Sequence, residues 1–109
     1  MKTFYLYPST RKDKKFMLVM PEFNHTHHFG ASGYKDFTLM NNRNSTFYEA
    51  DKSKRDKTKR AYLARHRGDP KGIHSPSTMS DMFLWSAPTL AGGIKNYEKK
   101  YNVNVIYRR

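Results

Sequence analysis

Alternating apolar runs near the start of the chain predict a β-hairpin. Residues 3 to 7 (TFYLY) and 15 to 19 (KFMLV) are rich in aromatic and aliphatic side chains, and the segment between them carries Pro8 and several turn-forming residues. Residues 23 to 29 (FNHTHHF) continue the alternation, so we expect a third strand with one shared face, made of Phe23, His25, His27 and Phe29. Strands are therefore predicted within residues 1 to 29.

Helical spacing replaces this alternation in the middle of the chain. Residues 40 to 54 show no clear period and predict a loop. The next segment has Tyr62 and His66 at helical spacing among good helix formers, and Gly68 follows it. We therefore expect a basic helix over residues 55 to 67.

A second helical part is predicted over residues 78 to 101. Thr78 and Asp81 are spaced like a capping signal for the apolar stretch 79 to 86. Thr89 then begins a helix whose apolar stripe consists of Leu90, Ile94, Tyr97 and Tyr101. An adjacent pair of glycines weakens this helix, which indicates that something packs closely against it.

The last residues alternate again. Val103, Val105 and Tyr107 predict a strand over residues 103 to 107 that returns to the N-terminal hairpin. Residues 1 to 109 are expected to form one small α+β domain. It would consist of an N-terminal β-hairpin, a third strand and a C-terminal strand, packed with two to three short helices.

Composition adds a charge imbalance to this picture. The formal net charge is +12, from 21 Lys and Arg against 9 Asp and Glu, so we expect an acidic partner. Cysteine is absent, which excludes disulfides, thiolate catalysis and cysteine metal sites. No window approaches about 18 apolar residues, and the first apolar stretch is too short for a signal peptide. We expect neither a membrane span nor export.

The positive charge is concentrated in residues 52 to 67, which hold eight basic residues and one acid. Such a segment can neutralise phosphates with little sequence preference, bind an acidic protein surface, or form a solvated helix face. All three interpretations stay open at this point. The candidate residues for binding a partner or nucleic acid are Lys52, Lys54, Arg55, Lys57, Lys59, Arg60 and Arg67.

Metal and enzyme chemistry find little support in the residues. Strand alternation places His25 and His27 about 7 Å apart on one face, where they could share a metal only with a third ligand from elsewhere. His66 and His74 are isolated in the sequence, the nine acids are scattered among lysines, and neither a nucleophile elbow nor a P-loop is present. We expect no metal, no cofactor, no catalytic residue and no small-molecule substrate.

Two further segments have alternative interpretations. The glycines of GASG (residues 30 to 33) have the spacing of the clamp that grips nucleic-acid backbone in KH domains, but that clamp lies between helices and these glycines follow a predicted strand. A tight turn that tucks Phe29, Tyr34 and Phe37 inward is favoured. The apolar segment MFLWSAPTL (82 to 90) is expected to be mainly core, with part of it available to dock on another protein.

Three spaced motifs carry a family resemblance. They are HFGASGYKDFT (28 to 38), KRAYLARHR (59 to 67) and FLWSAPTLAGGIKNYEKKY (83 to 101). Their order resembles a functionally uncharacterised family of short basic proteins encoded by nucleocytoplasmic large DNA viruses. The motif positions are His28, Phe29, Gly30, Gly33, Tyr34, Asp36, Phe37, Thr38, Tyr62, Arg65, His66, Leu84, Trp85, Pro88, Thr89 and Leu90. The segment between residues 41 and 57 departs from the family pattern in being longer.

The resemblance implies a function, because small basic proteins of these viruses are commonly virion components. We expect a non-enzymatic virion structural protein, a minor capsid component that cements larger shell proteins. It would lie in the capsid of the virion, and in the host cytoplasm or viral factory during assembly. The alternative is a DNA-binding virion or viral-factory protein that uses the basic segment 52 to 67 without sequence specificity.

One contact is predicted within the motifs. Asp36 belongs to the first motif, and a buried or half-buried carboxylate needs a cationic partner. The cations within the same pattern are Arg65 and His66. We therefore predict that Asp36 pairs with one of them and that the turn holds the third strand to the basic helix.

Overall fold

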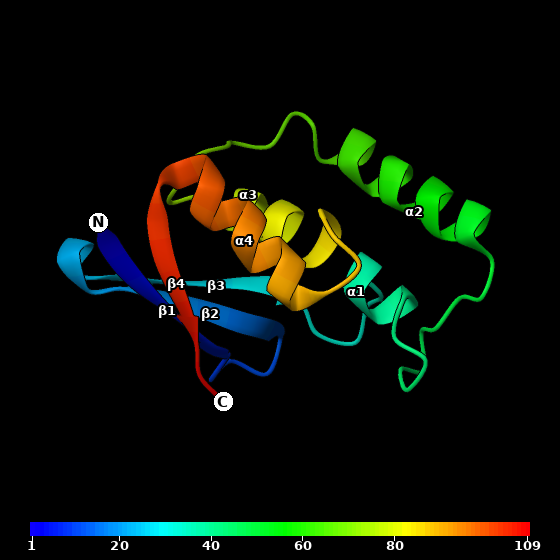
Figure 1. Cartoon of the computed structure of the whole chain (residues 1–109), viewed down its shortest axis with the longest axis horizontal. Helices are drawn as coiled ribbons and strands as arrows, with labels where there is room; N and C mark the ends of the chain where they lie inside the picture. Colours follow the sequence, from blue (N-terminus) through cyan, green and yellow to red (C-terminus); the bar gives the residue numbers. More distant parts are fainter.

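A four-stranded sheet forms the base of the fold (Figure 1). The computed structural model describes residues 1–109. Its strands are β1 (Lys2–Pro8), β2 (Lys14–Met20), β3 (His25–Ala31) and β4 (Val103–Tyr107), in the spatial order β3-β2-β1-β4. The predicted hairpin, third strand and last strand are confirmed, and with them the α+β class.

The strand directions follow from the connections. β1 and β2 are antiparallel, with Tyr5 opposite Val19, and β2 and β3 are antiparallel as well. β4 runs parallel to β1, with Val105 opposite Phe4. A parallel pair requires a crossover, and all four α-helices lie in the connection between β3 and β4. β3 and β4 are the edge strands of the sheet.

The α-helices of this crossover begin at capping residues. They are α1 (Phe37–Met40) after Asp36, α2 (Lys52–Arg65) after Asp51, α3 (Pro76–Met79) after Ser75 and α4 (Leu90–Tyr101) after Thr89. Each capping side chain accepts a hydrogen bond from a backbone N–H in the first turn. Between α3 and α4, η2 (Ser80–Trp85) has π-helical hydrogen bonding. None of the helices combines the length and the apolar character needed to cross a membrane.

Two helix starts differ from the prediction. The basic helix begins at Lys52 rather than at residue 55, because Asp51 caps it and the charged residues that follow are good helix formers. The stretch after residue 75 is capped by Ser75 and not by Thr78. The hydroxyl of Thr78 is buried and accepts a hydrogen bond from the N–H of Gly72 (2.9 Å).

Two other differences concern short elements. Phe23 lies in η1 (Pro21–Phe23), a single turn of 3-10 helix, so the third strand begins later than predicted. α1 has no counterpart among the predicted elements, since four residues are too few to show a helical period.

Fourteen buried hydrophobic side chains form one core between the sheet and the helices. Phe4 and Leu6 of β1 contribute from the sheet, and Phe83 stacks on Tyr97 with ring centroids 4.7 Å apart. The segment from 82 to 90 supplies much of the helical side, including Leu84 and Trp85. It is therefore mainly core, as expected.

Gly93 marks the closest approach between two helices. A Cβ at this position would lie 2.6 Å from the backbone oxygens of both Met82 and Phe83. Only a residue without a side chain allows α4 to pack this closely on η2. The close contact predicted from the glycine pair is confirmed at Gly93.

The sheet has one covered and one uncovered face. α3 packs on β3 and α4 on β4, and these helices cover a single face of the sheet, whereas α2 lies farther from the strands (Figure 1). Side chains of a strand alternate between faces, and in β1 Phe4 and Leu6 are buried while Tyr5 and Tyr7 stay half-buried. We call the other side the open sheet face. Its apolar side chains are Tyr5, Tyr7, Met17, Val19 and Ile106.

Candidate functional site

Residues from all three sequence motifs meet at one cleft. It lies between β3 with its following turn, the C-terminal half of α2, and η2, and its volume is about 480 Å³. The motif residues that line it are Phe29, Gly30, Tyr34, Asp36, Tyr62, Arg65, His66, Leu84 and Trp85. We call it the cationic cleft, because its lining also includes Lys14, Lys15 and Lys35.

The turn after β3 forms one wall of the cleft. Gly30 and Gly33 have φ angles of 78° and 81°, a conformation that favours glycine, so the predicted tight turn is confirmed. A Cβ at Gly30 would lie 2.8 Å from Cδ1 of Leu84, which lets β3 approach η2 closely. The turn does not tuck every aromatic residue inward. Phe29 is buried, but Tyr34 is 70% exposed at the cleft.

Asp36 is buried at the start of α1, and its predicted partners are wrong. Its carboxylate accepts a hydrogen bond from the ammonium group of Lys15 at 2.7 Å and another from the N–H of Leu39 at 3.0 Å. Arg65 and His66 form no ion pair with it; His66 pairs instead with Asp69. Lys15 lies on β2, beside the strand that leads into the turn, so the contact holds the turn to the sheet rather than to α2.

An aromatic stack joins α2 to η2 at the base of the cleft. The rings of Tyr62 and Trp85 are 4.1 Å apart and nearly parallel, at 7°, and the ring of His66 lies 4.3 Å from that of Tyr62. Burial raises the pKa of the Tyr62 phenol to about 12. The stacked ring of Tyr62 therefore anchors α2, whose exposed residues are mostly charged, to η2.

A serine, a histidine and an aspartate meet at the cleft, but not in the order of a catalytic triad. His66 Nδ1 lies 2.8 Å from a carboxylate oxygen of Asp69, and the Ser77 hydroxyl donates to that same oxygen at 3.1 Å. These two hydrogen bonds lower the pKa of Asp69. In a triad the serine must donate to the histidine. Here the carboxylate instead fixes both neighbours in place.

Three cations of the cleft have no acidic partner. Lys14, Lys35 and Arg65 take part in none of the five ion pairs of the structure. The lining of the same cleft includes the ring of Tyr34, which is 70% exposed. Cations beside an exposed aromatic surface suit an anionic group on a flat or apolar carrier.

The predicted binding residues of the basic segment differ in how available they are to a partner. Lys54, Lys57 and Arg60 are exposed, belong to no ion pair and follow one another at three-residue spacing. Arg67, just beyond α2, is exposed as well. Lys52 is exposed but pairs with Asp56 at 3.1 Å. The four side chains without an ion pair are therefore available to a partner.

The other two predicted residues of α2 have structural contacts. Arg55 donates to the backbone oxygen of Glu49 at 2.6 Å. The ammonium group of Lys59 lies 4.7 Å from the centre of the Phe37 ring, within the range of a cation–π contact. Both side chains hold α2 against the preceding segment and are poor candidates for binding.

Several motif residues lie outside the cleft lining. The His28 ring is 2.7 Å from the Ser9 hydroxyl, at the opposite face of β3. Gly33 belongs to the turn, and Pro88 is exposed directly before the α4 cap. Lys14 and Lys15 line the cleft but were not predicted as site residues. Their only signal in the sequence was that they begin β2, which pairs with the strand that leads into the first motif.

Comparison with known proteins gives one partial match. Residues 5–45 match the model of a family of unknown function, DUF5754. The matched stretch runs from β1 to just beyond α1, so it includes the turn and Asp36 but neither α2 nor Trp85. No curated protein and no solved structure matches the chain.

Proposed function

We propose that the protein is a non-enzymatic structural component of a virus particle, a minor capsid protein that fastens larger shell proteins to one another. The resemblance of its three motifs to short basic proteins of large DNA viruses supports the viral setting. The net charge of +12 supports an acidic partner. The protein would reside in the capsid, after assembly in the host cytoplasm or viral factory.

The observation that carries this proposal is the presence of two different surfaces on different sides of the molecule. One side presents the cationic cleft and the free cations of α2. The other presents the open sheet face, where Ile106 is 43% exposed and no helix covers Tyr5 or Tyr7. A fastener must contact two neighbours at once. An acidic neighbour suits the first surface and an apolar neighbour suits the second.

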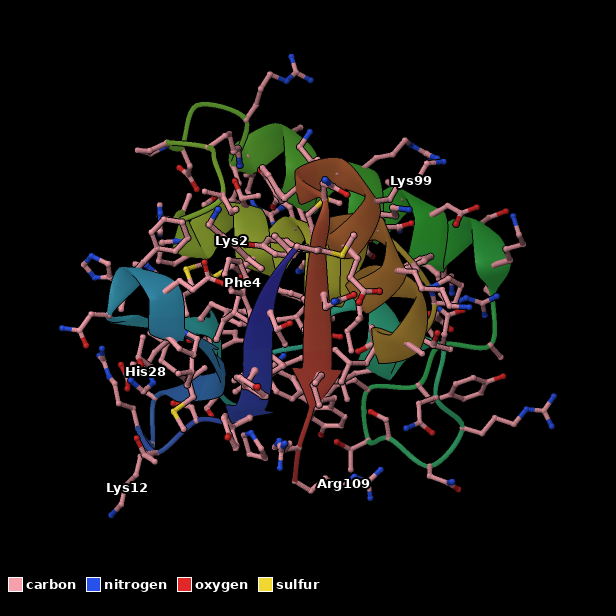
Figure 2. All side chains as sticks on the ribbon, turned by 60° about the vertical axis from the view of Figure 1, so that its left-hand side comes forward. Lys2, Phe4, Lys12, His28, Lys99 and Arg109 are labelled. Carbon is pink, nitrogen blue, oxygen red and sulfur yellow. The ribbon has the colours of Figure 1, made fainter.

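Positive charge is also distributed around the molecule. Figure 2 shows Lys12, Lys99 and Arg109 at separate places on its outline. In a protein that binds nucleic acid in a single groove, the basic residues cluster on one side of the molecule. In a protein surrounded by acidic neighbours, the basic residues can be spread over the whole surface. The dispersed cations therefore favour protein partners.

The test is cross-linking mass spectrometry on intact purified particles. A lysine-reactive reagent should link Lys54 or Lys57 of α2 to one shell protein. A second set of links, from Lys12 in the turn between β1 and β2, should reach a shell protein as well. Absence of links to the shell, together with recovery of the protein bound to DNA and released by salt, would overturn the proposal.

One observation favours a second function, DNA binding without sequence preference. Lys54, Lys57 and Arg60 are free and aligned on α2, and such residues can each neutralise a phosphate. The purified protein and its Lys54→Gln/Lys57→Gln variant can be titrated with duplex DNA at several salt concentrations. If DNA is the partner, the logarithmic salt slope should fall by about 2 in the variant. A Tyr5→Ser/Ile106→Ser variant, altered on the open sheet face, should keep the original slope.

A further inference from the structure

Three histidines from two distant parts of the chain meet at the edge strand β3. His25 and His27 lie on β3, and His74 lies in the segment between α2 and α3. The ring centroids are 5.7 Å apart for His25 and His27, 5.9 Å for His25 and His74, and 5.7 Å for His27 and His74. No group of three or more histidine, cysteine or acidic side chains is arranged to hold a metal ion. The contact is thus between imidazoles themselves.

Two nitrogens of this cluster are buried without hydrogen-bond partners. They are Nε2 of His27 and Nδ1 of His74. A neutral imidazole tolerates such a position better than a charged one, because a charged ring needs a partner for each N–H. Burial lowers the pKa of His27, and the neighbouring His74 and His25 lower it further.

No acidic side chain offsets a charge on the cluster. On β2, the residues opposite His25 and His27 are Met20 and Leu18, which are apolar. The rings of Phe23 and His74 are nearly perpendicular, with their centroids 4.6 Å apart. The ammonium group of Lys2 lies 5.6 Å from the centre of the Phe23 ring. Glu22, the one acid of η1, is exposed.

The remaining charged groups near the cluster are engaged elsewhere or are cationic. His28, on the opposite face of β3, contacts Ser9. Lys71, three residues before His74, donates to Asp81 at 2.7 Å and to Ser77 at 2.9 Å. None of the five ion pairs of the structure includes a histidine of the cluster, so protonation of His27 meets like charge and no paired counter-ion.

The two sides of the cluster are held differently. The segment that carries His74 is fixed, since the hydroxyl of the fully buried Tyr97 donates to the backbone oxygen of Ile73 at 2.7 Å. β3 is an edge strand and pairs with β2 alone. Repulsion within the cluster would therefore displace the start of β3 rather than the segment before α3.

We propose that His25, His27 and His74 form a proton-sensitive latch, which holds the start of β3 to the segment before α3 while the imidazoles are neutral and releases it when they are protonated. The sign follows from the lowered pKa of His27. The unfolded or opened chain binds the proton more readily, so the latch is fully effective above the ordinary histidine pKa of 6.5 and weakens as the pH falls below it.

The test is hydrogen exchange of the full chain at about pH 7.5 and about pH 5, corrected for the intrinsic pH dependence of exchange. In the wild type, backbone amides of residues 25 to 29 should lose protection at the lower pH, while those at the centre of β1 keep it. A His27→Gln/His74→Gln variant should show no such acid-dependent loss. The control is His66→Gln, which removes a histidine outside the cluster and should retain the wild-type loss.

Two results would overturn the latch. One is a wild-type β3 that keeps its protection at acid pH; the other is a double variant that loses protection as the wild type does. Because the double variant could fail to fold, the wild type supplies a second measurement. NMR titration of the ring protons should place the midpoint of His27 below the ordinary value of 6.5. A midpoint at or above that value contradicts the proposal.

Discussion

At the scale of single residues, Asp36 is the side chain on which the turn after β3 depends. It is 2% exposed, and its carboxylate joins Lys15 to the first turn of α1. Asp36→Asn removes the charge and leaves the ammonium group of Lys15, which is 15% exposed, without its counter-ion. We expect the free energy of unfolding to fall by about 3 kcal/mol, at the lower end of what breaking a buried pair costs.

The free energy of unfolding of Asp36→Asn can be measured by urea denaturation, and Asp13→Asn provides a matched control. Asp13→Asn breaks the pair between Asp13 and Arg11, in which both side chains are more than half exposed. That change should cost much less than the loss of the Asp36 pair, because solvent screens an exposed pair. Equal losses in the two variants would mean that burial of Asp36 adds nothing to its pairing.

Gly93 offers a second prediction at this scale. In Gly93→Ala the new methyl group would press on the backbone oxygens of Met82 and Phe83, which cannot rotate away as a side chain can. We expect a net loss of about 1–3 kcal/mol despite the better helix propensity of alanine. Gly68→Ala is the control, since no atom lies within 4 Å of its new Cβ. Its unfolding midpoint in urea should stay close to the wild type.

At the scale of elements, the sequence predicts that α2 is a helix but does not predict where α2 packs. The helix has no buried residue and charges on all sides, so its apolar pattern is weak, although its propensity and Gly68 still predict it correctly. Its actual anchor is the Tyr62 ring on Trp85, 23 positions later in the chain, which no local pattern contains. The strands were easier to predict because their alternation directly reflects the two faces of a sheet.

The same anchor predicts how the protein responds to alkali. The Tyr62 phenol has a pKa of about 12 in the folded protein and about 10 when exposed, so its burial stabilises the fold below pH 10. This stabilisation is lost as the pH rises from 10 towards 12, because the unfolded chain releases the proton first. Burial also raises the pKa of Tyr97. We expect unfolding within this alkaline range.

Absorbance of tyrosinate, followed together with circular dichroism, measures this response. Most tyrosines should ionise first, and a last fraction should ionise only as the helical signal disappears. In Tyr62→Phe the alkaline unfolding should shift to higher pH, because one of the two linked protons is gone. If all tyrosines ionise before the fold is lost, Tyr62 and Tyr97 are not protected by burial.

At the scale of the whole molecule, the cationic cleft is made by contacts that the sequence alone could not predict. The three motifs were recognised separately, and the structure brings their residues to one place. The partner of Asp36 was predicted within the motifs and is instead Lys15, because β2 lies beside β3 in the sheet. His74 looked isolated for the same reason. Contacts across a sheet or a crossover depend on topology, which spacing along the chain does not reveal.

The charge of the whole molecule leads to a last prediction, which concerns stability without a partner. Lys54 and Lys57 are exposed neighbours on α2 with no acidic partner. Changing both to glutamine lowers the net charge from +12 by two and keeps helix propensity nearly constant. Like charges one turn apart destabilise a helix by about 0.2–0.5 kcal/mol per pair. The variant should therefore be more stable than the wild type at low ionic strength.

Salt separates this electrostatic effect from a packing effect. The gain in the urea midpoint should disappear at about 1 M salt, where the screening length is about 3 Å. Lys12→Gln/Lys95→Gln makes the same change in charge at two exposed positions outside α2 and should give a smaller gain. A gain that persists at high salt would indicate altered packing of α2. If it disappears, the lysines of α2 destabilise the free molecule, which is expected of side chains kept to contact an acidic partner.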